Sequence, residues 1–210
     1  MPLPMVHLAV AVQMHALMDS SASPDFLLGS IAPDAIHMRA GSGRDDKRMI
    51  HLSETNDPEN ERVRSFLEQI GSCGQLGFAE GYASHILTDR LWVGRFDAFF
   101  TNKMTPQLTR EERRTLYYLE TDQIDFDLYH QASWRSEVWS RLASAQPKEF
   151  GSLLTAEEIS RWRDRTLIWF DQLKQEPKIT PVYFTSTDVQ LFIGHAAKKV
   201  IEFFKLYWCK

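Results

Sequence analysis

The stretch that decides the fold class runs from Gln75 to Phe100 and reads QLGFAEGYASHILTDRLWVGRFDAFF. Its large side chains recur every three or four positions, and two polar residues, His85 and Asp89, fall on the same stripe. Because a helix has 3.6 residues per turn, this spacing predicts one long helix. The stripe consists of Phe78, Tyr82, His85, Asp89, Trp92 and Phe96. We expect its aromatic residues to pack in the core rather than to bind lipid.

The same periodicity predicts helices before this stretch. Residues 7–18 place most of their apolar side chains on one face of a helix. Ser23-Pro24 predicts an N-cap followed by proline in the first turn of a short helix. We expect Pro33 to disrupt that helix, which leaves Asp34 beside the break.

Helical signals also dominate the rest of the chain. Two capping boxes, Thr109 with Glu112 and Thr155 with Glu158, predict two further helix starts. The other predicted features are a loop over 40–47, a helix from Asp57-Pro58 to about Ile70, a cap at Ser133, a connector over 176–185 and a last helix from about Thr187. Since no stretch alternates as a strand would, we expect an all-α protein, a single domain over residues 1–210 with about eight helices.

Composition and charge exclude several classes of protein. The chain has 210 residues, 43% of them hydrophobic and 25% charged, and a formal charge of −4, so we expect no stable complex with nucleic acid. Cys73 and Cys209 are the only cysteines, which indicates neither a thiolate zinc site nor a disulfide framework. The N-terminal residues lack the pattern of a signal peptide, and no apolar run is long enough for a transmembrane helix. We therefore expect a cytoplasmic protein.

The spacing of His85 and Asp89 is the first indication of chemistry. Residues four apart on a helix point the same way, so this pair can share one metal ion. An imidazole with a carboxylate suits zinc and similar divalent ions. Burying Asp89 in an aromatic stripe costs free energy unless a cation or strong hydrogen bonds compensate.

Three further residues are candidate ligands, although each has an ordinary alternative. His7 lies on the apolar face of the first helix, and taken alone it is more typical of a core histidine than of a ligand. Asp34 follows a proline, where aspartate often caps a helix or forms a turn. His51 follows the predicted loop and is equally compatible with an exposed loop histidine.

Four segments within the first 92 residues together resemble the metal-site segments of the zinc-dependent phospholipase C family. They are Pro4-Met-Val-His7, Phe26-Leu-Leu-Gly-Ser-Ile-Ala-Pro-Asp34, His51, and Gly81-Tyr-Ala-Ser-His85-Ile-Leu-Thr-Asp89-Arg-Leu-Trp92. Members of that family are all-helical and hold a cluster of zinc ions that hydrolyses phosphodiester bonds, and single-strand-specific zinc nucleases are similar in fold and metal arrangement. The resemblance implies that His7, Asp34, His51, His85 and Asp89 are metal ligands, with Asp89 bridging two ions.

The chain departs from that family at two places. It begins Met1-Pro-Leu-Pro4, where the secreted phospholipases expose a processed N-terminal residue whose amine and carbonyl help to hold one zinc. The family's later HxxxE ligands have no match, because neither His130 nor His195 is followed by a glutamate four residues on. We therefore expect one or two ions, zinc or another divalent metal, rather than three.

Other charged residues could serve the same site. Arg39, Lys47 and Arg48 surround the predicted loop and could hold a substrate phosphate, or could simply be solvated. Four acidic residues before His130 could complete a metal shell, although a solvated helix face is the more ordinary interpretation. These four are Glu120, Asp122, Asp125 and Asp127.

The combined pattern predicts a metal-dependent phosphoesterase. Metal-activated water would attack a small phosphoester or phosphodiester, with a phospholipid among the candidate substrates. Asp34 would be a ligand or the base that orients the attacking water. The alternatives are a non-catalytic helical module with a structural metal and a nucleotide phosphohydrolase. The sequence has no adjacent His-Asp pair, which counts against the commonest pattern of the second class.

Overall fold

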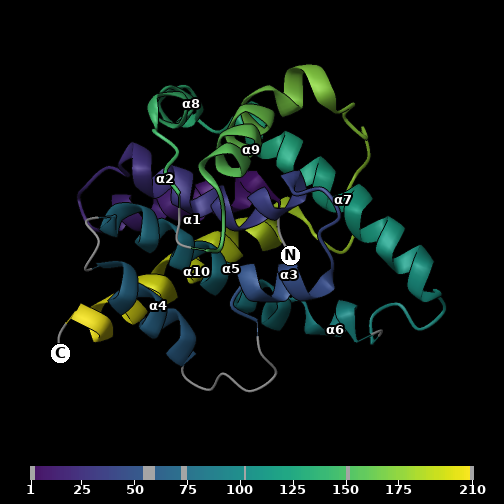
Figure 1. The fold of residues 1–210 in the computed structure, drawn as a ribbon. Helices are drawn as coiled ribbons and strands as arrows, with labels where there is room; N and C mark the ends of the chain where they lie inside the picture. The colour runs from purple at the N-terminus through teal and green to yellow at the C-terminus, as the bar shows by residue number, and fades with distance from the viewer. Residues whose placement is uncertain (1–2, 54–59, 72–74, 102, 150–151, 209–210) are drawn as a thin grey trace.

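A computed structural model describes residues 3–53, 60–71, 75–101, 103–149 and 152–208, and within them the protein is all-helical with no β-strand (Figure 1). The helices are α1 (Pro4–Leu17), α2 (Pro24–Ile31), the 3-10 helix η1 (Ala32–Met38), α3 (Arg44–Ile50), α4 (Glu61–Gly71), α5 (Leu76–Arg95), α6 (Asp97–Phe100), α7 (Arg110–Gln131), α8 (Arg135–Ser144), α9 (Ala156–Ile168), the π-helical turn η3 (Trp169–Leu173) and α10 (Ser186–Trp208). The predicted fold class is therefore confirmed, with ten α-helices in the described residues against the expected eight or so.

Helix α1 forms the centre of the protein and contacts α2, α5, α7 and α10 (Figure 1). It is apolar on almost every side, and Met5, Leu8, Val10 and Met14 are fully buried. A helix that is apolar all round is stable only inside a protein, where other helices cover each of its faces. His7 lies one turn after the start of α1, so the burial of this helix carries an imidazole into the core.

Helices α2 and α5 cross at two glycines. A Cβ on Gly29 would lie 2.1 Å from the carbonyl oxygen of Phe78, and a Cβ on Gly81 would lie 2.1 Å from the carbonyl oxygen of Phe26. No side-chain carbon can approach an oxygen so closely, so glycine is required for the two backbones to touch. This crossing determines how closely the next turn of α5, which carries His85, approaches α2.

Several predicted helix starts are confirmed in detail. The hydroxyl of Ser23 accepts a hydrogen bond from the backbone N–H of Phe26, as expected of an N-cap before proline. Both predicted capping boxes are present, at the start of α7 and at the start of α9. The α-helix ends at Ile31, two residues before Pro33, but the chain continues directly as η1, and Pro33 and Asp34 both lie in this tighter helix.

Two predicted boundaries around the site are wrong. Arg44–Ile50 form α3, so the predicted loop over 40–47 is shorter than expected. The predicted helix from Gln75 to Phe100 is divided, because Phe96 leaves helical backbone angles with φ −105° and ψ 23°. Its ring instead packs between Trp92 and Phe184, at centroid distances of 4.5 and 4.8 Å.

Ser133 does not cap a helix, since the residue that precedes α8 is Trp134. The predicted start at Asp57-Pro58 lies outside the described residues, and α4 occupies Glu61–Gly71. The aromatic stripe of α5 is buried as predicted, and it packs against α10 and the segment before it. Within the described part of the chain, no helix combines the length and the apolar character needed to cross a membrane.

Candidate metal centre

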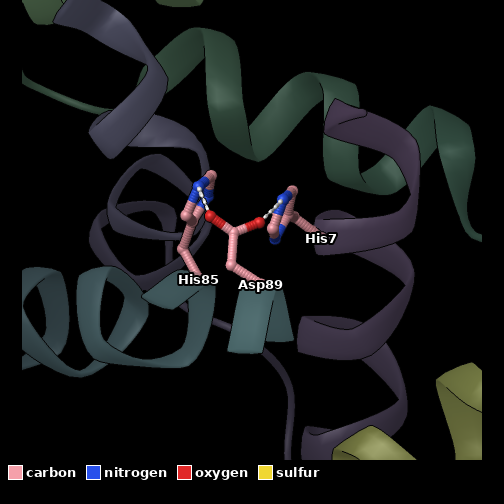
Figure 2. A group of neighbouring side chains, drawn as sticks. All are labelled: His7, His85 and Asp89. Atoms are coloured by element: carbon pink, nitrogen blue, oxygen red, sulfur yellow. Dashed lines mark ion pairs between the residues drawn. The ribbon is translucent and has the colours of Figure 1, made fainter. Parts of the chain in front are cut away.

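The five predicted ligands converge at one point in the core. His7 comes from α1, Asp34 from η1, His51 from the residue that ends α3, and His85 and Asp89 from α5. The Asp89 carboxylate lies between two of the histidines, with Oδ1 3.5 Å from Nε2 of His7 and Oδ2 3.6 Å from Nε2 of His85 (Figure 2). Nε2 of His51 lies 3.8 Å from Oδ2 of Asp89 and 3.5 Å from Oδ1 of Asp34.

Backbone carbonyls orient two of these imidazoles. Nδ1 of His85 lies 2.8 Å from the carbonyl oxygen of Ser30, and Nδ1 of His51 lies 3.0 Å from that of Lys47. A carbonyl oxygen only accepts hydrogen bonds, so both Nδ1 atoms carry the proton. In the neutral ring the lone pair is then on Nε2, which faces the carboxylates, as in the outer shell of metal-binding histidines.

The atoms that face the centre lack hydrogen-bond partners. Among the described residues, Nε2 of the three histidines and both oxygens of Asp89 are buried and without a donor or acceptor in range. Each such atom costs about 1–3 kcal/mol unless something satisfies it. A tetrahedral zinc ion with bonds of about 2.0–2.2 Å holds its ligand atoms about 3.3–3.6 Å apart. Three of the four N–O separations match that spacing, at 3.5, 3.6 and 3.5 Å, so the donor set fits a divalent ion.

The protonation of the centre also suits a cation. Burial and the neighbouring His85 ring lower the pKa of His7 well below its usual value, which keeps this ring neutral. Burial raises the pKa of Asp89, and the neighbouring rings of His85 and His51 offset this effect only in part. Burial would also raise the pKa of Asp34, but the contact with His51 and the nearby rings of His85 and His7 outweigh it and lower the pKa. A divalent ion would supply the compensation that Asp89 lacks.

The edge of the centre at Asp34 is its most accessible part. The Asp34 side chain is 13% exposed, and His37, whose Nε2 is 3.9 Å from the Asp34 carboxylate, is 44% exposed. Burial lowers the pKa of His37, and the positive charges of Lys47 and Arg165 lower it further against the opposing effect of Asp34. No described carboxylate pairs with Lys47 or Arg165 within 4 Å. These two positive charges act on the same half-exposed histidine, which favours an anionic ligand at this edge.

The three predicted substrate-binding cations have different surroundings. Arg39 donates from Nε and Nη2 to the carboxylate of Glu158, at 2.6 and 3.0 Å, and from Nη2 to the carbonyl of Leu153 at 2.7 Å. These bonds tie η1 to α9 and give Arg39 a structural role. Arg48 is exposed and lies 3.8 Å from Asp45. Of the three, Lys47 is the one whose positive charge lowers the pKa of His37, at the accessible edge.

The acidic residues of α7 neither line the metal centre nor form a solvated face. Glu120 is buried and accepts hydrogen bonds from the backbone N–H groups of Tyr183 and Phe184, at 2.8 and 3.0 Å, so it anchors the segment before α10. Asp122 forms an ion pair with Lys174 at 2.6 Å. Asp127 accepts a hydrogen bond from the side chain of Gln123 at 2.9 Å. Both interpretations drawn from the sequence are therefore wrong for Glu120.

Asp125 has a role that the sequence did not indicate. Its buried Oδ2 accepts a hydrogen bond from the backbone N–H of Met5 at 3.3 Å, in the first turn of α1. No side chain within α1 caps that end of the helix, so Asp125 supplies from α7 the acceptor that an N-cap would provide. The Asp125 carboxylate thereby fixes the turn that carries His7.

Sequence reasoning missed the residues that support the ligands. The carbonyl of Ser30 and the hydroxyl of Tyr82, which donates to the carbonyl of Ile50 just before His51, leave no side-chain pattern that predicts them. Arg165 was missed because its approach to the site depends on how α9 packs against η1. The spacing of His85 and Asp89 was a sufficient signal only because both residues lie on one helix.

Comparisons with protein-family models, with curated proteins and with solved structures found no match to this chain. The resemblance to zinc-dependent phospholipases C therefore rests only on the four N-terminal segments that suggested it. What the structure adds is the convergence of those segments on one buried group of histidines and aspartates that could hold a metal ion.

Proposed function

We propose that this protein is a metal-dependent phosphoesterase that holds one or two divalent ions, zinc or a similar metal, and hydrolyses a small phosphoester or phosphodiester. One observation carries the proposal: three imidazole Nε2 atoms and both oxygens of Asp89 face one another, buried and unpaired among the described residues. A core that leaves so many polar atoms unsatisfied is unstable unless a ligand satisfies them. Three histidines and two aspartates form a donor set suited to zinc.

The residues divide into holding and reacting roles. His7, His51, His85 and Asp89 would hold the metal, since all four are buried. A divalent ion bound there supplies Lewis-acid chemistry, making water acidic enough to lose a proton near neutral pH and offsetting charge on the phosphoryl oxygens. Asp34, the most accessible of the five, is placed to orient the attacking water or to complete the ligand set.

Cations around the accessible edge support a phosphoester as the substrate. The positive charges of Lys47 and Arg165 act on His37, and neither side chain has a carboxylate partner among the described residues. A phosphoester carries negative charge, and lysine and arginine are the side chains that bind it most strongly. Phospholipids remain among the candidate substrates.

The number of ions follows from how the ligands are shared. Two groups of three residues have ligand atoms within 4.8 Å of one another, His7 with His85 and Asp89, and Asp34 with His51 and His85. His85 belongs to both groups but offers one Nε2 lone pair, so it binds one ion. Asp89 has an oxygen directed to each side, so a second ion would require Asp89 as the bridge.

A structural metal is the second candidate function, and the burial of the ligands favours it. His7, His51, His85 and Asp89 are each at most 7% exposed, which suits a closed site that ties α1, α3 and α5 together. Structural sites are coordinatively closed, whereas catalytic sites keep a position for water. Replacing zinc with cobalt and recording the visible spectrum, with and without inorganic phosphate, distinguishes them, because only an open site changes its spectrum.

The experiment for the proposed function measures metal and turnover together. Purified protein is analysed for metal by elemental analysis before and after mild chelation, while hydrolysis of bis(p-nitrophenyl) phosphate is followed. We expect one or two equivalents of metal and turnover that the chelator abolishes. His85→Ala and Asp89→Ala should lose both, and His195→Ala, which changes an exposed histidine of α10, should lose neither. Turnover that survives both ligand substitutions would refute the phosphoesterase.

A further inference from the structure

A cavity separate from the candidate metal centre lies between the start of α1 and the junction of α9 with η3. It has a volume of about 130 Å³, and its walls are the side chains of Leu3, Pro4, Trp162, Trp169 and Phe170, with Arg165 beside them. None of these residues is among the predicted ligands. Three of the walls are aromatic, and one guanidinium is the only charged group of the lining.

The π-helical turn η3 shapes this cavity. It spans Trp169–Leu173 and follows α9 directly, and its first two residues are both walls of the cavity. A π turn accommodates an extra residue without ending the helix, and such turns are frequent at functional sites. The Arg165 guanidinium lies 4.4 Å from the centre of the Trp169 ring, a cation–π contact that holds the charge at the cavity wall.

The cavity adjoins the accessible edge of the metal centre. The Trp162 ring lies 5.8 Å from the His37 ring, and Nε2 of His37 is 3.9 Å from the Asp34 carboxylate. Pro4, which also lines the cavity, begins the helix that carries His7 one turn later. Arg165 belongs to the same lining, so its positive charge lies on the cavity that Trp162 joins to His37.

We infer that this cavity binds a flat aromatic group of the substrate, one six-membered ring in size, while Arg165 binds the phosphate attached to it. The size fits, since a cavity of about 150 Å³ lined by apolar side chains binds benzene. Aromatic walls favour a ring over an alkyl chain of equal volume, because rings stack and meet edge to face. This inference rests on the proposed phosphoesterase function, and it narrows the substrate class to aryl phosphoesters.

The test compares two phosphonates that differ in one group. Zinc-loaded protein is titrated with phenylphosphonate and with methylphosphonate in a calorimeter, so that binding is read without turnover. We expect phenylphosphonate to bind about tenfold or more tightly, because the ring enters the cavity. Trp169→Leu should abolish this preference, and because Trp169 contacts the Arg165 guanidinium, any loss of methylphosphonate affinity should be no larger than that in Arg165→Gln. Arg165→Gln should weaken both phosphonates alike, since both carry the charged group.

A matched control is Trp134→Leu, which removes an indole that borders a different cavity, beside Val12 and Val138. This variant should keep the preference for phenylphosphonate. Equal affinity of the two phosphonates for the unaltered protein would overturn the aromatic subsite, as would loss of the preference in Trp134→Leu. Neither result would contradict the proposed phosphoesterase function. A phenyl preference that depends on Trp169 in a protein that hydrolyses no phosphoester would uphold the subsite and refute the catalytic function. Retained zinc binding shows that each variant is folded.

Discussion

Nδ1 of His85 donates a hydrogen bond to the carbonyl oxygen of Ser30 over 2.8 Å, across the point where α5 crosses α2. The crossing is close because Gly29 and Gly81 each contact the backbone of the other helix. The helix packing and the orientation of one candidate ligand therefore depend on the same contact. A change at either glycine should affect both the stability of the protein and its affinity for a metal ion.

Gly81→Ala should destabilise the protein and weaken metal binding. The new Cβ would lie 2.1 Å from the carbonyl oxygen of Phe26, so α2 and α5 would have to separate. Overpacking of this kind costs about 1–3 kcal/mol or more. Gly194→Ala, in the interior of α10 where a Cβ meets nothing within 4 Å, is the matched control and should stabilise by about 1 kcal/mol. Urea unfolding measures the stability of both variants. Equal changes in stability at Gly81 and Gly194 would contradict the close contact between α2 and α5.

Asp89→Asn should raise stability without metal and lower it with metal. Burial raises the pKa of Asp89, so the carboxylate is costly in the metal-free core, and an amide removes that cost at neutral pH. We expect the metal-free variant to be about 1 kcal/mol more stable than the unaltered protein, as is common when a functional group is removed from a site. Added zinc should reverse the order, because only the carboxylate binds it well. Thermal melts with chelator and with zinc check this, and an unchanged order would contradict the metal site.

Metal affinity should rise with pH through the neutral range. Burial lowers the pKa of His51, but the contact with Asp34 and the charges of Asp34 and Asp89 outweigh burial and raise it. The proton on Nε2 must leave before an ion binds there, so binding releases a proton below the raised pKa. Affinity should therefore increase about tenfold per pH unit while His51 is protonated, and level off above that range. Competition with a chromophoric chelator measures the slope, and a pH-independent affinity would exclude His51 as a ligand.

Asp125→Ala should destabilise α1, whereas Asp125→Asn should not. Alanine removes the acceptor for the N–H of Met5, a loss of about 1–2 kcal/mol for a helix cap, while asparagine keeps an acceptor oxygen. Burial raises the pKa of Asp125 well above its usual value, so its contribution to stability is full below the unfolded pKa and declines as pH rises. The stability of Asp125→Asn relative to the unaltered protein should therefore increase from about pH 4 to about pH 8. Denaturant unfolding at several pH values measures this relative stability. A fall in the stability of Asp125→Asn relative to the unaltered protein as pH rises would contradict the prediction.

The features that the sequence could predict are those that depend on residues close together in the chain. Helical periodicity predicted the all-α class, Ser23 and two threonines marked helix starts, and the spacing of His85 and Asp89 placed two candidate ligands on one side of α5. Resemblance to a family proposed the other three, which the fold brings to the same point. Each of these signals comes from a short segment, where 3.6 residues per turn decides the outcome.

Contacts between distant segments could not be predicted. Arg39 was expected near a phosphate but pairs with Glu158, which is 119 residues later in the chain. The acidic residues of α7 looked solvated, yet Glu120 and Asp125 are buried because they accept backbone hydrogen bonds from elsewhere. The division at Phe96 depends on the ring of Phe184. In each case the partner, rather than the local pattern, decides the role of the residue.

The Asp125 carboxylate of α7, which accepts a hydrogen bond from the first turn of α1, has a consequence for the order of events during translation. All five candidate ligands lie within the first 89 residues, but Asp125 is 120 positions after the N–H group that it accepts. A nascent chain that has just left the ribosome with His7 to Asp89 therefore still lacks the group that fixes the first turn of α1. We therefore expect the candidate metal centre to be completed only after synthesis has passed α7, and an N-terminal fragment released earlier would carry every candidate ligand without holding His7 in place.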